Sequence, residues 1–212
     1  MTTSIIAGAS GLVGTNILQQ LCAQKRDVIA LSRRPVANLP RNANELIIDF
    51  DSFLEDGLLP KCDNIFICLG TTIKIAGSQE NFRKVDFEYC LSIAKKAKES
   101  GAQTLSLVSS IGANSSSKNF YLRTKGELEE AIQDLGFLTV NIFRPSFLVG
   151  ERSEKRLAEK IAINLAKIMD LFLIGTASKY RSVKAQSLAK TMVLKVASKP
   201  GVNYFYFDDF LK

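Results

Sequence analysis

The chain of 212 residues is 46% hydrophobic and 23% charged, with a net charge of +7 and no histidine. These proportions are typical of a globular protein with one domain, here residues 1–212, and the missing histidine excludes every imidazole-dependent mechanism, the Ser-His-Asp triad included. No apolar run is long enough to span a membrane and no secretion signal is recognisable at the start, so we expect a cytoplasmic protein without a membrane span.

The first predicted strand, residues 4–7, leads into a glycine loop and then into a helix. The loop has the G-x-x-G-x-x-G spacing of a dinucleotide-binding turn, with Gly8, Gly11 and Gly14 as its glycines. The first permits a tight turn, the second lets the backbone approach a pyrophosphate, and the third lets helix and strand pack closely. Free N–H groups of the helix N-terminus then face the negative charge. The alternative is a structural turn without a ligand, and the position between strand and helix favours a dinucleotide.

The second predicted strand, residues 28–32, ends at the position that selects the cofactor. An NAD-specific site usually has an acid there, which holds the ribose 2′-hydroxyl. This chain has Ser32-Arg33-Arg34 instead, and two guanidinium groups suit a 2′-phosphate. We therefore predict NADP(H) rather than NAD(H), with Arg33 and Arg34 as ligands. The other interpretation makes the two arginines a plain surface turn.

Three further strands and a long helix follow. The strands are predicted at residues 46–50, 65–69 and 104–108, and the second of them is a continuous apolar run suited to burial on both faces. A helix is predicted over residues 79–100, with Gly101 as its C-cap. Its apolar residues recur at three- and four-residue spacing, namely Phe82, Val85, Tyr89, Ile93 and Ala97.

A tyrosine and a lysine lie four residues apart in the helix predicted over residues 119–134. This spacing places Tyr121 and Lys125 on one helical face. A free tyrosine titrates at about pH 10, and a neighbouring ammonium makes it a better acid–base group; the lysine is also suited to hydrogen-bond the nicotinamide ribose. Ser109, at the end of the preceding strand, is suited to polarise a substrate carbonyl, with Ser110 as a second candidate. The alternative is an amphipathic tyrosine beside a solvated lysine.

The C-terminal part begins with a strand predicted at residues 138–143. Helices are predicted at about 154–170 and 185–197, and a last strand at 202–207. The first of these helices has an apolar stripe, expected to pack on the chain's own sheet or on a dimer partner: Leu157, Ile161, Leu165 and Ile168. The alternation of strands and helices predicts an α/β fold, a Rossmann-type doubly wound parallel sheet with a small helix-rich C-terminal subregion.

Residues 151–212 hold 12 basic and six acidic side chains. This third is either a solvated basic face or a surface for a phosphorylated ligand, an acidic protein partner or a homodimer. Its basic residues are not interleaved with exposed aromatic residues, which argues against nucleic acid as a partner.

Four cysteines form no C-x-x-C pair, and without histidine no metal site is expected. We interpret them as small buried hydrophobes: Cys22, Cys62, Cys68 and Cys90.

Several motifs together resemble the short-chain dehydrogenases/reductases. They are the glycine loop, the run Cys68-Leu69-Gly70-Thr71-Thr72, Ser109, Tyr121-x-x-x-Lys125 and Phe143-Arg144-Pro145. With Val85-Asp86 and the run Lys125-Gly126-Glu127-Leu128-Glu129, the chain is most similar to the atypical branch of Tat-interactive-protein-like oxidoreductases. The resemblance covers about residues 4–156.

This resemblance implies an NADP(H) site and carbonyl–alcohol chemistry. Tyr121 is then the proton donor, Lys125 tunes it and holds the ribose, and Ser109 orients the carbonyl. Many extended family members have an asparagine where this chain has Asp86, so a water relay through that position is not expected. The cofactor contacts that the resemblance implies, besides those of the glycines and arginines, are Ser10, Leu12, Val13, Asp49, Phe50, Leu69, Gly70, Tyr121, Lys125, Pro145, Leu148 and Arg156.

Members of this branch are also linked to regulatory and protein-binding roles, so catalysis does not follow from the fold. Two functions therefore stand side by side. One is an NADP(H)-dependent oxidoreductase that acts on a small carbonyl or alcohol substrate. The other is an NADP(H)-binding regulatory module without turnover.

Overall fold

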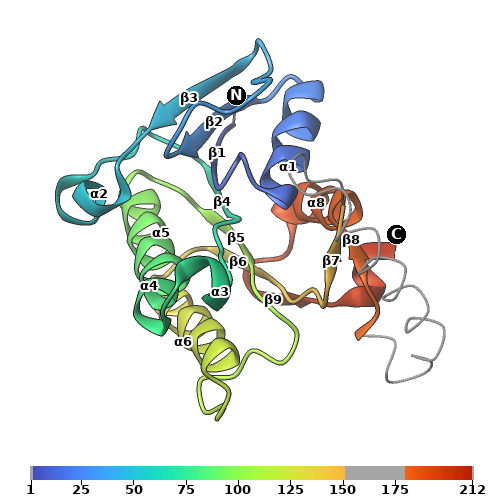
Figure 1. Ribbon diagram of the computed structural model, residues 1–212. Coiled ribbons are helices and arrows are strands. Elements are labelled where there is room, and N and C mark those ends of the chain that lie inside the picture. The colour runs from blue at the N-terminus through green and yellow to red at the C-terminus, as the bar shows by residue number, and fades with distance from the viewer. Residues whose placement is uncertain (1, 151–179, 212) are drawn as a thin grey trace.

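The computed structural model describes residues 2–150 and 180–211, organised around one seven-stranded sheet (Figure 1). The strand order is β3-β2-β1-β4-β5-β6-β9, and all neighbouring strands are parallel. The chain moves outward from β1 to β3 and then continues on the other side from β4. This is the predicted Rossmann-type sheet, with its switch point between β1 and β4. The strands are β1 (Thr3–Ala7), β2 (Asp27–Ser32), β3 (Ala43–Ile47), β4 (Asn64–Ile67), β5 (Thr104–Val108), β6 (Thr139–Phe143) and β9 (Gly201–Phe205).

Helices cover both faces of the sheet (Figure 1). The helices on one face are α1 (Leu12–Ala23) and α8 (Ala185–Leu194), and those on the other are α2 (Phe50–Asp56), α5 (Cys90–Glu99) and α6 (Phe120–Gln133). Short helical turns continue the C-terminal part as η3 (Lys195–Ala197) and η4 (Phe207–Leu211). None of the helices within the described ranges is both long enough and apolar enough to cross a membrane.

The central strands are buried on both faces because successive side chains alternate between two apolar cores. Ile5 pairs with Ile65 in register, and both pack toward α5 and α6. Ile6 pairs with Phe66, and both pack toward α1 and α8. All four side chains are fully buried. Burial of each one stabilises the folded state by about 1.5–3 kcal/mol relative to leaving it exposed. These strands fix the loops at their carboxyl ends.

The long helix predicted over residues 79–100 contains a π-helical segment. It consists of α4 (Gln79–Arg83), η1 (Lys84–Tyr89) and α5, and Gly101 follows it with a φ of +98°. A π turn contains one extra residue, so the residues that face the core lie one position later in the sequence than regular helical spacing predicts. Asp86 and Cys90 are therefore buried where the regular spacing predicted Val85 and Tyr89.

Other elements differ from the sequence prediction in extent. Strand β3 ends at Ile47, three residues earlier than expected, because Asp49 instead caps α2 by accepting a hydrogen bond from the Ser52 N–H at 2.9 Å. The expected helix at about 154–170 lies outside the described residues. The sequence did not predict α2, the short α3 (Ile73–Ala76), or the small parallel sheet of β7 (Leu148–Val149) and β8 (Val183–Lys184).

Candidate functional site

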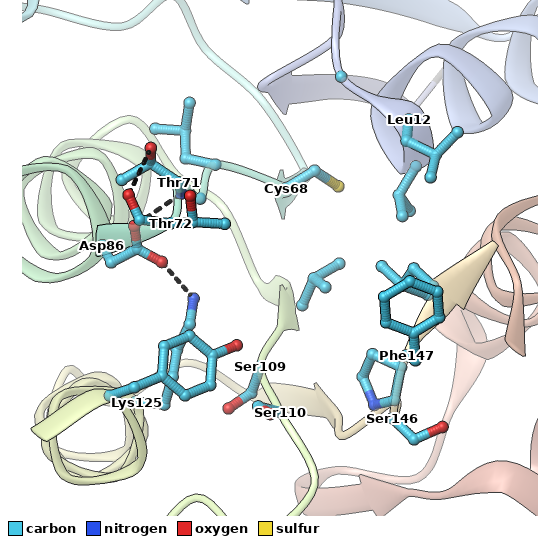
Figure 2. Close-up of a pocket in the computed structure, with 18 of the residues that line it drawn as sticks. Leu12, Cys68, Thr71, Thr72, Asp86, Ser109, Ser110, Lys125, Ser146 and Phe147 are labelled. Atoms are coloured by element: carbon cyan, nitrogen blue, oxygen red, sulfur yellow. Dashed lines mark hydrogen bonds and ion pairs between the residues drawn. The ribbon is translucent and has the colours of Figure 1, made fainter. Parts of the chain in front are cut away.

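A pocket of about 430 Å³ lies at the carboxyl ends of the central strands. The loops after β1, β4, β5 and β6 line it (Figure 2). In a doubly wound sheet this edge, next to the switch point, is where ligands bind. The structure therefore brings together segments that are far apart in the sequence.

The glycine loop forms a tight turn between β1 and α1. Gly8 has a φ of +85°, and a Cβ there would lie 2.8 Å from the carbonyl oxygen of Cys68. A Cβ on Gly14 would lie 2.2 Å from the carbonyl oxygen of Gly8, so the start of the helix packs directly against the loop backbone. Both positions require glycine for geometric reasons.

Gly11 is the N-cap residue of α1 and lines the pocket. No side chain caps the helix at this residue, and the first turn contains no acidic residue. The N–H groups and the positive end of the helix dipole are thus available to an anion. These features suit an anion such as a pyrophosphate, while the tight turn itself leaves no room for a Cβ at Gly8 and Gly14.

Lys125 and Asp86 form a buried ion pair within the pocket lining. The Lys125 Nζ lies 2.8 Å from the Asp86 Oδ1, and the other carboxylate oxygen accepts the Thr71 N–H at 2.8 Å (Figure 2). Burial is the largest single influence and lowers the pKa of Lys125, but the charges of Asp86, Tyr121 and Cys90 and the hydrogen bond to Asp86 together outweigh it, so that the pKa is raised overall. The lysine stays charged, and its position is tied to both η1 and the loop after β4.

Tyr121 lies one helical turn before Lys125 on α6, and both side chains line the pocket. Its ring packs against Phe82, with the ring centroids 5.6 Å apart. Gly126 lets α6 approach the loop at residues 114–115 closely, because a Cβ there would lie 2.2 Å from the Ser115 nitrogen. These contacts fix the helix that carries Tyr121 and Lys125.

A second buried carboxylate, Glu129, lies behind the pocket. It accepts a hydrogen bond from the Ser109 hydroxyl and forms an ion pair with Arg144, which follows β6. Arg144 also donates to the Tyr206 hydroxyl at 3.2 Å. This network joins the end of β5 to the C-terminal segment. The Ser109 proton therefore points to Glu129 rather than into the pocket.

Sequence reasoning did not assign a role to Glu129. The signal was present, because Glu129 follows Lys125 by four residues and thus extends the face that carries Tyr121 and Lys125. The Asp86–Lys125 pair was not predicted either, since regular helical spacing places Val85 rather than Asp86 on the buried face, and only the π-helical segment brings Asp86 there.

Of the residues predicted to bind or react, the pocket brings eleven together. They are Gly11, Leu12, Val13, Leu69, Gly70, Ser109, the second candidate Ser110, Tyr121, Lys125, Pro145 and Leu148. Gly8, Ser10 and Gly14 belong to the same glycine loop but do not line the pocket. The functional role of each of these residues stays a prediction.

The remaining predicted residues lie elsewhere. Arg33 and Arg34 are exposed just after β2, in a turn held by the Ser32 hydroxyl, which donates to the Arg34 carbonyl at 2.8 Å. Asp49 caps α2, and Phe50 is buried in the core, so the structure does not bring this pair to the pocket. Arg156 lies outside the described residues.

All four cysteines are free, and three are buried. Burial raises the pKa of the Cys90 thiol to about 12 and that of Cys62 to about 11. Burial also raises the pKa of Cys68, which lines the pocket. The interpretation as small buried hydrophobes therefore agrees with Cys22, Cys62 and Cys90, whereas Cys68 is only half-buried. A raised pKa disfavours the thiolate, which is the reactive form of cysteine.

Comparison with known proteins identifies a family. The model of the NAD(P)H-binding family matches residues 8–168 of the chain. The FMP52 protein of Debaryomyces hansenii, named as mitochondrial, is 34% identical over 206 residues, which cover 93% of this chain and 88% of that protein. Protein HTATIP2 of Rattus norvegicus is 35% identical over 163 residues, covering 74% of this chain and 67% of that protein. In eight such curated relatives, the matched stretch spans 66% to 88% of their own length.

Solved structures show the same fold at low sequence identity. MoeE5 in complex with UDP-glucose and NAD has a TM-score of 0.73 at 15% identity, covering 95% of this chain and 74% of that chain. The human epimerase family protein SDR39U1 with NADPH has a TM-score of 0.67 at 17% identity, covering 96% and 74%. One of these proteins is seen with NAD and the other with NADPH.

The predicted cytoplasmic location is wrong. Five fungal relatives between 34% and 40% identical are named as mitochondrial proteins. The prediction depended on the absence of a recognisable secretion signal, and such an absence does not distinguish the cytosol from an organelle.

Proposed function

This chain belongs to the NAD(P)H-binding family, as an atypical short-chain dehydrogenase/reductase of the HTATIP2 type, and we propose that it is an NADP(H)-dependent oxidoreductase that interconverts a carbonyl and an alcohol. One observation carries the proposal. Tyr121 and Lys125 line the same pocket as Gly11, the N-cap residue of α1. A proton donor and a site for a dinucleotide thus share one cavity.

The glycine loop and α1 would hold the pyrophosphate of the cofactor. When bound, NADPH supplies the hydride for carbonyl reduction. Tyr121 delivers the proton to the carbonyl oxygen, the task of a positioned general acid. Lys125, kept charged by Asp86 at 2.8 Å, favours the negative charge that Tyr121 acquires as the proton leaves, and it is close enough to the pocket to contact the ribose.

Ser109 is proposed to orient the carbonyl, and this role requires that its hydroxyl first leaves Glu129. Its hydroxyl has one proton, which is donated to Glu129. To donate to a substrate, the hydroxyl must rotate away from Glu129, which keeps its ion pair with Arg144. A substrate thus competes with a buried carboxylate for this proton.

NADP(H) is proposed over NAD(H) because of Arg33 and Arg34. Both side chains are exposed just after β2, the strand next to β1. Guanidinium groups at this strand end suit the 2′-phosphate that distinguishes the two cofactors. The turn is further held by Glu45, which accepts the Val36 N–H at 2.5 Å.

The contacts of Ser109 and Lys125 favour a second function, that of a cofactor-binding protein without turnover. The Ser109 hydroxyl and the Lys125 ammonium are both engaged by buried carboxylates. A protein that binds NADP(H) to order a surface for another protein, without turnover, needs neither group to be free. This is the regulatory module that the sequence left open.

The mitochondrial names of the fungal relatives support a mitochondrial location for this chain. Fractionation of cells that produce the full-length protein tests this proposal. Recovery of the protein in a fraction other than mitochondria contradicts it.

Turnover separates the two functions. The purified chain is incubated with NADPH and a panel of aldehydes and ketones, while loss of NADPH and formation of alcohol are followed together. An oxidoreductase forms one alcohol for each NADPH oxidised. Tight NADPH binding without reduction of any carbonyl overturns the enzyme proposal and favours the regulatory module.

A further inference from the structure

Two large apolar side chains are exposed where they line the pocket. Ile75, on the short helix α3, is 73% exposed, and Phe147, which follows β6, is 56% exposed. Figure 2 shows Phe147 across the pocket from Lys125 and Asp86. Single exposed apolar residues are common on protein surfaces, but two that line one concave site indicate a surface for an apolar ligand.

The charges of the pocket neutralise one another. Within the described part of the lining, Lys125 and Asp86 are the only residues with a formal charge, and they are paired at 2.8 Å. With the start of α1 taken by the cofactor pyrophosphate, a substrate carboxylate or phosphate that entered would lose water without gaining a free cation from the described lining, and Asp86 would repel it. Transfer of an unpaired charge into such a site is costly.

Both polar and apolar side chains line the cavity. Ser109 and Ser110 lie near Lys125 (Figure 2), and Tyr121 precedes Lys125 by one helical turn. Ile75 and Phe147 line the same cavity from the segments after β4 and β6, which also carry Thr71, Thr72 and Ser146. A ligand with a carbonyl near Tyr121 and an apolar body can contact both kinds of side chain. A nucleotide sugar, such as the UDP-glucose bound to MoeE5, would bring a second diphosphate, whereas the one anion-binding feature of the described lining, the start of α1, is the proposed place of the cofactor pyrophosphate.

We infer that the substrate of this site is a neutral aldehyde or ketone with an apolar chain or ring, whose body contacts Ile75 and Phe147. This inference rests on the proposed oxidoreductase function. The carbonyl carbon receives a hydride from NADPH, which leaves as NADP⁺, and the oxygen receives the Tyr121 proton. Solvent returns a proton to Tyr121, and the product is a neutral alcohol.

Two aldehydes of matched shape test the charge argument. 4-Methylbenzaldehyde and 4-formylbenzoate share a ring and differ in a methyl group against a carboxylate. With NADPH present, we expect kcat/KM to be at least about tenfold higher for the methyl compound, the difference that corresponds to about 1.4 kcal/mol. Equal or faster reduction of 4-formylbenzoate overturns the inference and leaves the oxidoreductase function standing.

Two variants test the apolar contacts. Ile75→Ser and Phe147→Ser should each raise KM for 4-methylbenzaldehyde several-fold while the Kd for NADPH stays unchanged. Leu194→Ser is the matched control, because Leu194 is 62% exposed and does not line the pocket. Unchanged KM values in both pocket variants contradict the inference.

A binding measurement keeps the inference testable if no carbonyl is reduced. Nile red, a neutral apolar dye, is titrated into the NADPH-loaded protein and its variants. Weaker binding in Ile75→Ser and Phe147→Ser, but not in Leu194→Ser, supports an apolar ligand site even where the oxidoreductase function fails. Equal affinity in all four proteins, or no binding, overturns the inference.

Discussion

The Lys125 Nζ lies 2.8 Å from the Asp86 Oδ1, and the two side chains are 6% and 0% exposed. The pair joins α6 to the π-helical segment η1, and through the Thr71 N–H it also joins the loop after β4. One pair thus fixes two walls of the pocket. Because water does not solvate either charge, each depends on the other for its compensation.

Asp86→Asn should therefore destabilise the protein strongly. The amide keeps an oxygen for the Thr71 N–H but leaves the Lys125 charge buried and unpaired. Breaking a buried pair in this way costs about 3–5 kcal/mol, measurable as a lower free energy of unfolding in urea. The double variant Asp86→Asn/Lys125→Met should recover part of that loss. A single variant as stable as wild type would show that the pair contributes little.

The same pair predicts a dependence on alkaline pH. The folded-state pKa of Lys125 is raised above its ordinary value of 10.5, so folding favours the protonated lysine. Its stabilisation is fully present below about pH 10.5 and is lost as the pH rises through the folded-state pKa. The stability difference between wild type and the double variant should stay constant from neutral pH to about pH 9.5 and shrink above pH 10.5. A difference that grows with pH contradicts this assignment.

Substitutions at two glycines of the glycine loop should have different effects, one on stability and the other on NADPH binding. Gly14→Ala places a Cβ 2.2 Å from the Gly8 carbonyl oxygen, so the loop must shift and the free energy of unfolding should fall. Gly11→Val leaves the fold largely intact, because Gly11 has a φ of −81° and its Cβ would lie 3.2 Å from the same oxygen. Its side chain instead enters the space of the pyrophosphate, and NADPH binding should be abolished. Normal NADPH affinity in Gly11→Val would remove this loop from the site.

The sheet was predictable because its signals are local. The apolar runs of β4 and β5, the glycine loop and the N-cap Asn119 of α6 each specify their element without help from distant residues. Tyr121 and Lys125 could be found for the same reason, since four-residue spacing fixes a helical face.

What could not be predicted depends on tertiary contacts. The π-helical segment moves Asp86 to the buried face, and nothing in the local spacing distinguishes it from a regular helix. Glu129 and Ser109 come from α6 and the end of β5, and only the packing of that helix on the sheet brings them together. Strand β3 was predicted three residues too late, because the cap at Asp49 competes with strand formation there.

Cofactor preference should depend on Arg33 and Arg34. Replacement of both by alanine should weaken NADPH binding by about tenfold for each charge-assisted hydrogen bond lost, with little change for NADH. Fluorescence titration with both cofactors measures the ratio. Lys25→Ala/Arg41→Ala is the matched control, because it removes two exposed positive charges at the amino ends of β2 and β3. Equal weakening of NADPH by both double variants would indicate a general charge effect instead of a 2′-phosphate site.

Tyr121→Phe tests the chemistry directly. The substitution keeps the ring and its packing against Phe82 at 5.6 Å, so the Kd for NADPH should change little. If Tyr121 delivers the proton, turnover of a reduced carbonyl should fall by about 100- to 10,000-fold, the usual scale for the loss of positioned proton transfer. Tyr204→Phe, which removes a hydroxyl on β9, should leave turnover unchanged.

Lys125→Met should lower turnover and also weaken NADPH binding, so that Tyr121→Phe and Lys125→Met together separate proton transfer from cofactor binding. Full turnover in Tyr121→Phe would mean that another group delivers the proton, and the mechanism derived from the shared helical face of Tyr121 and Lys125 would be wrong.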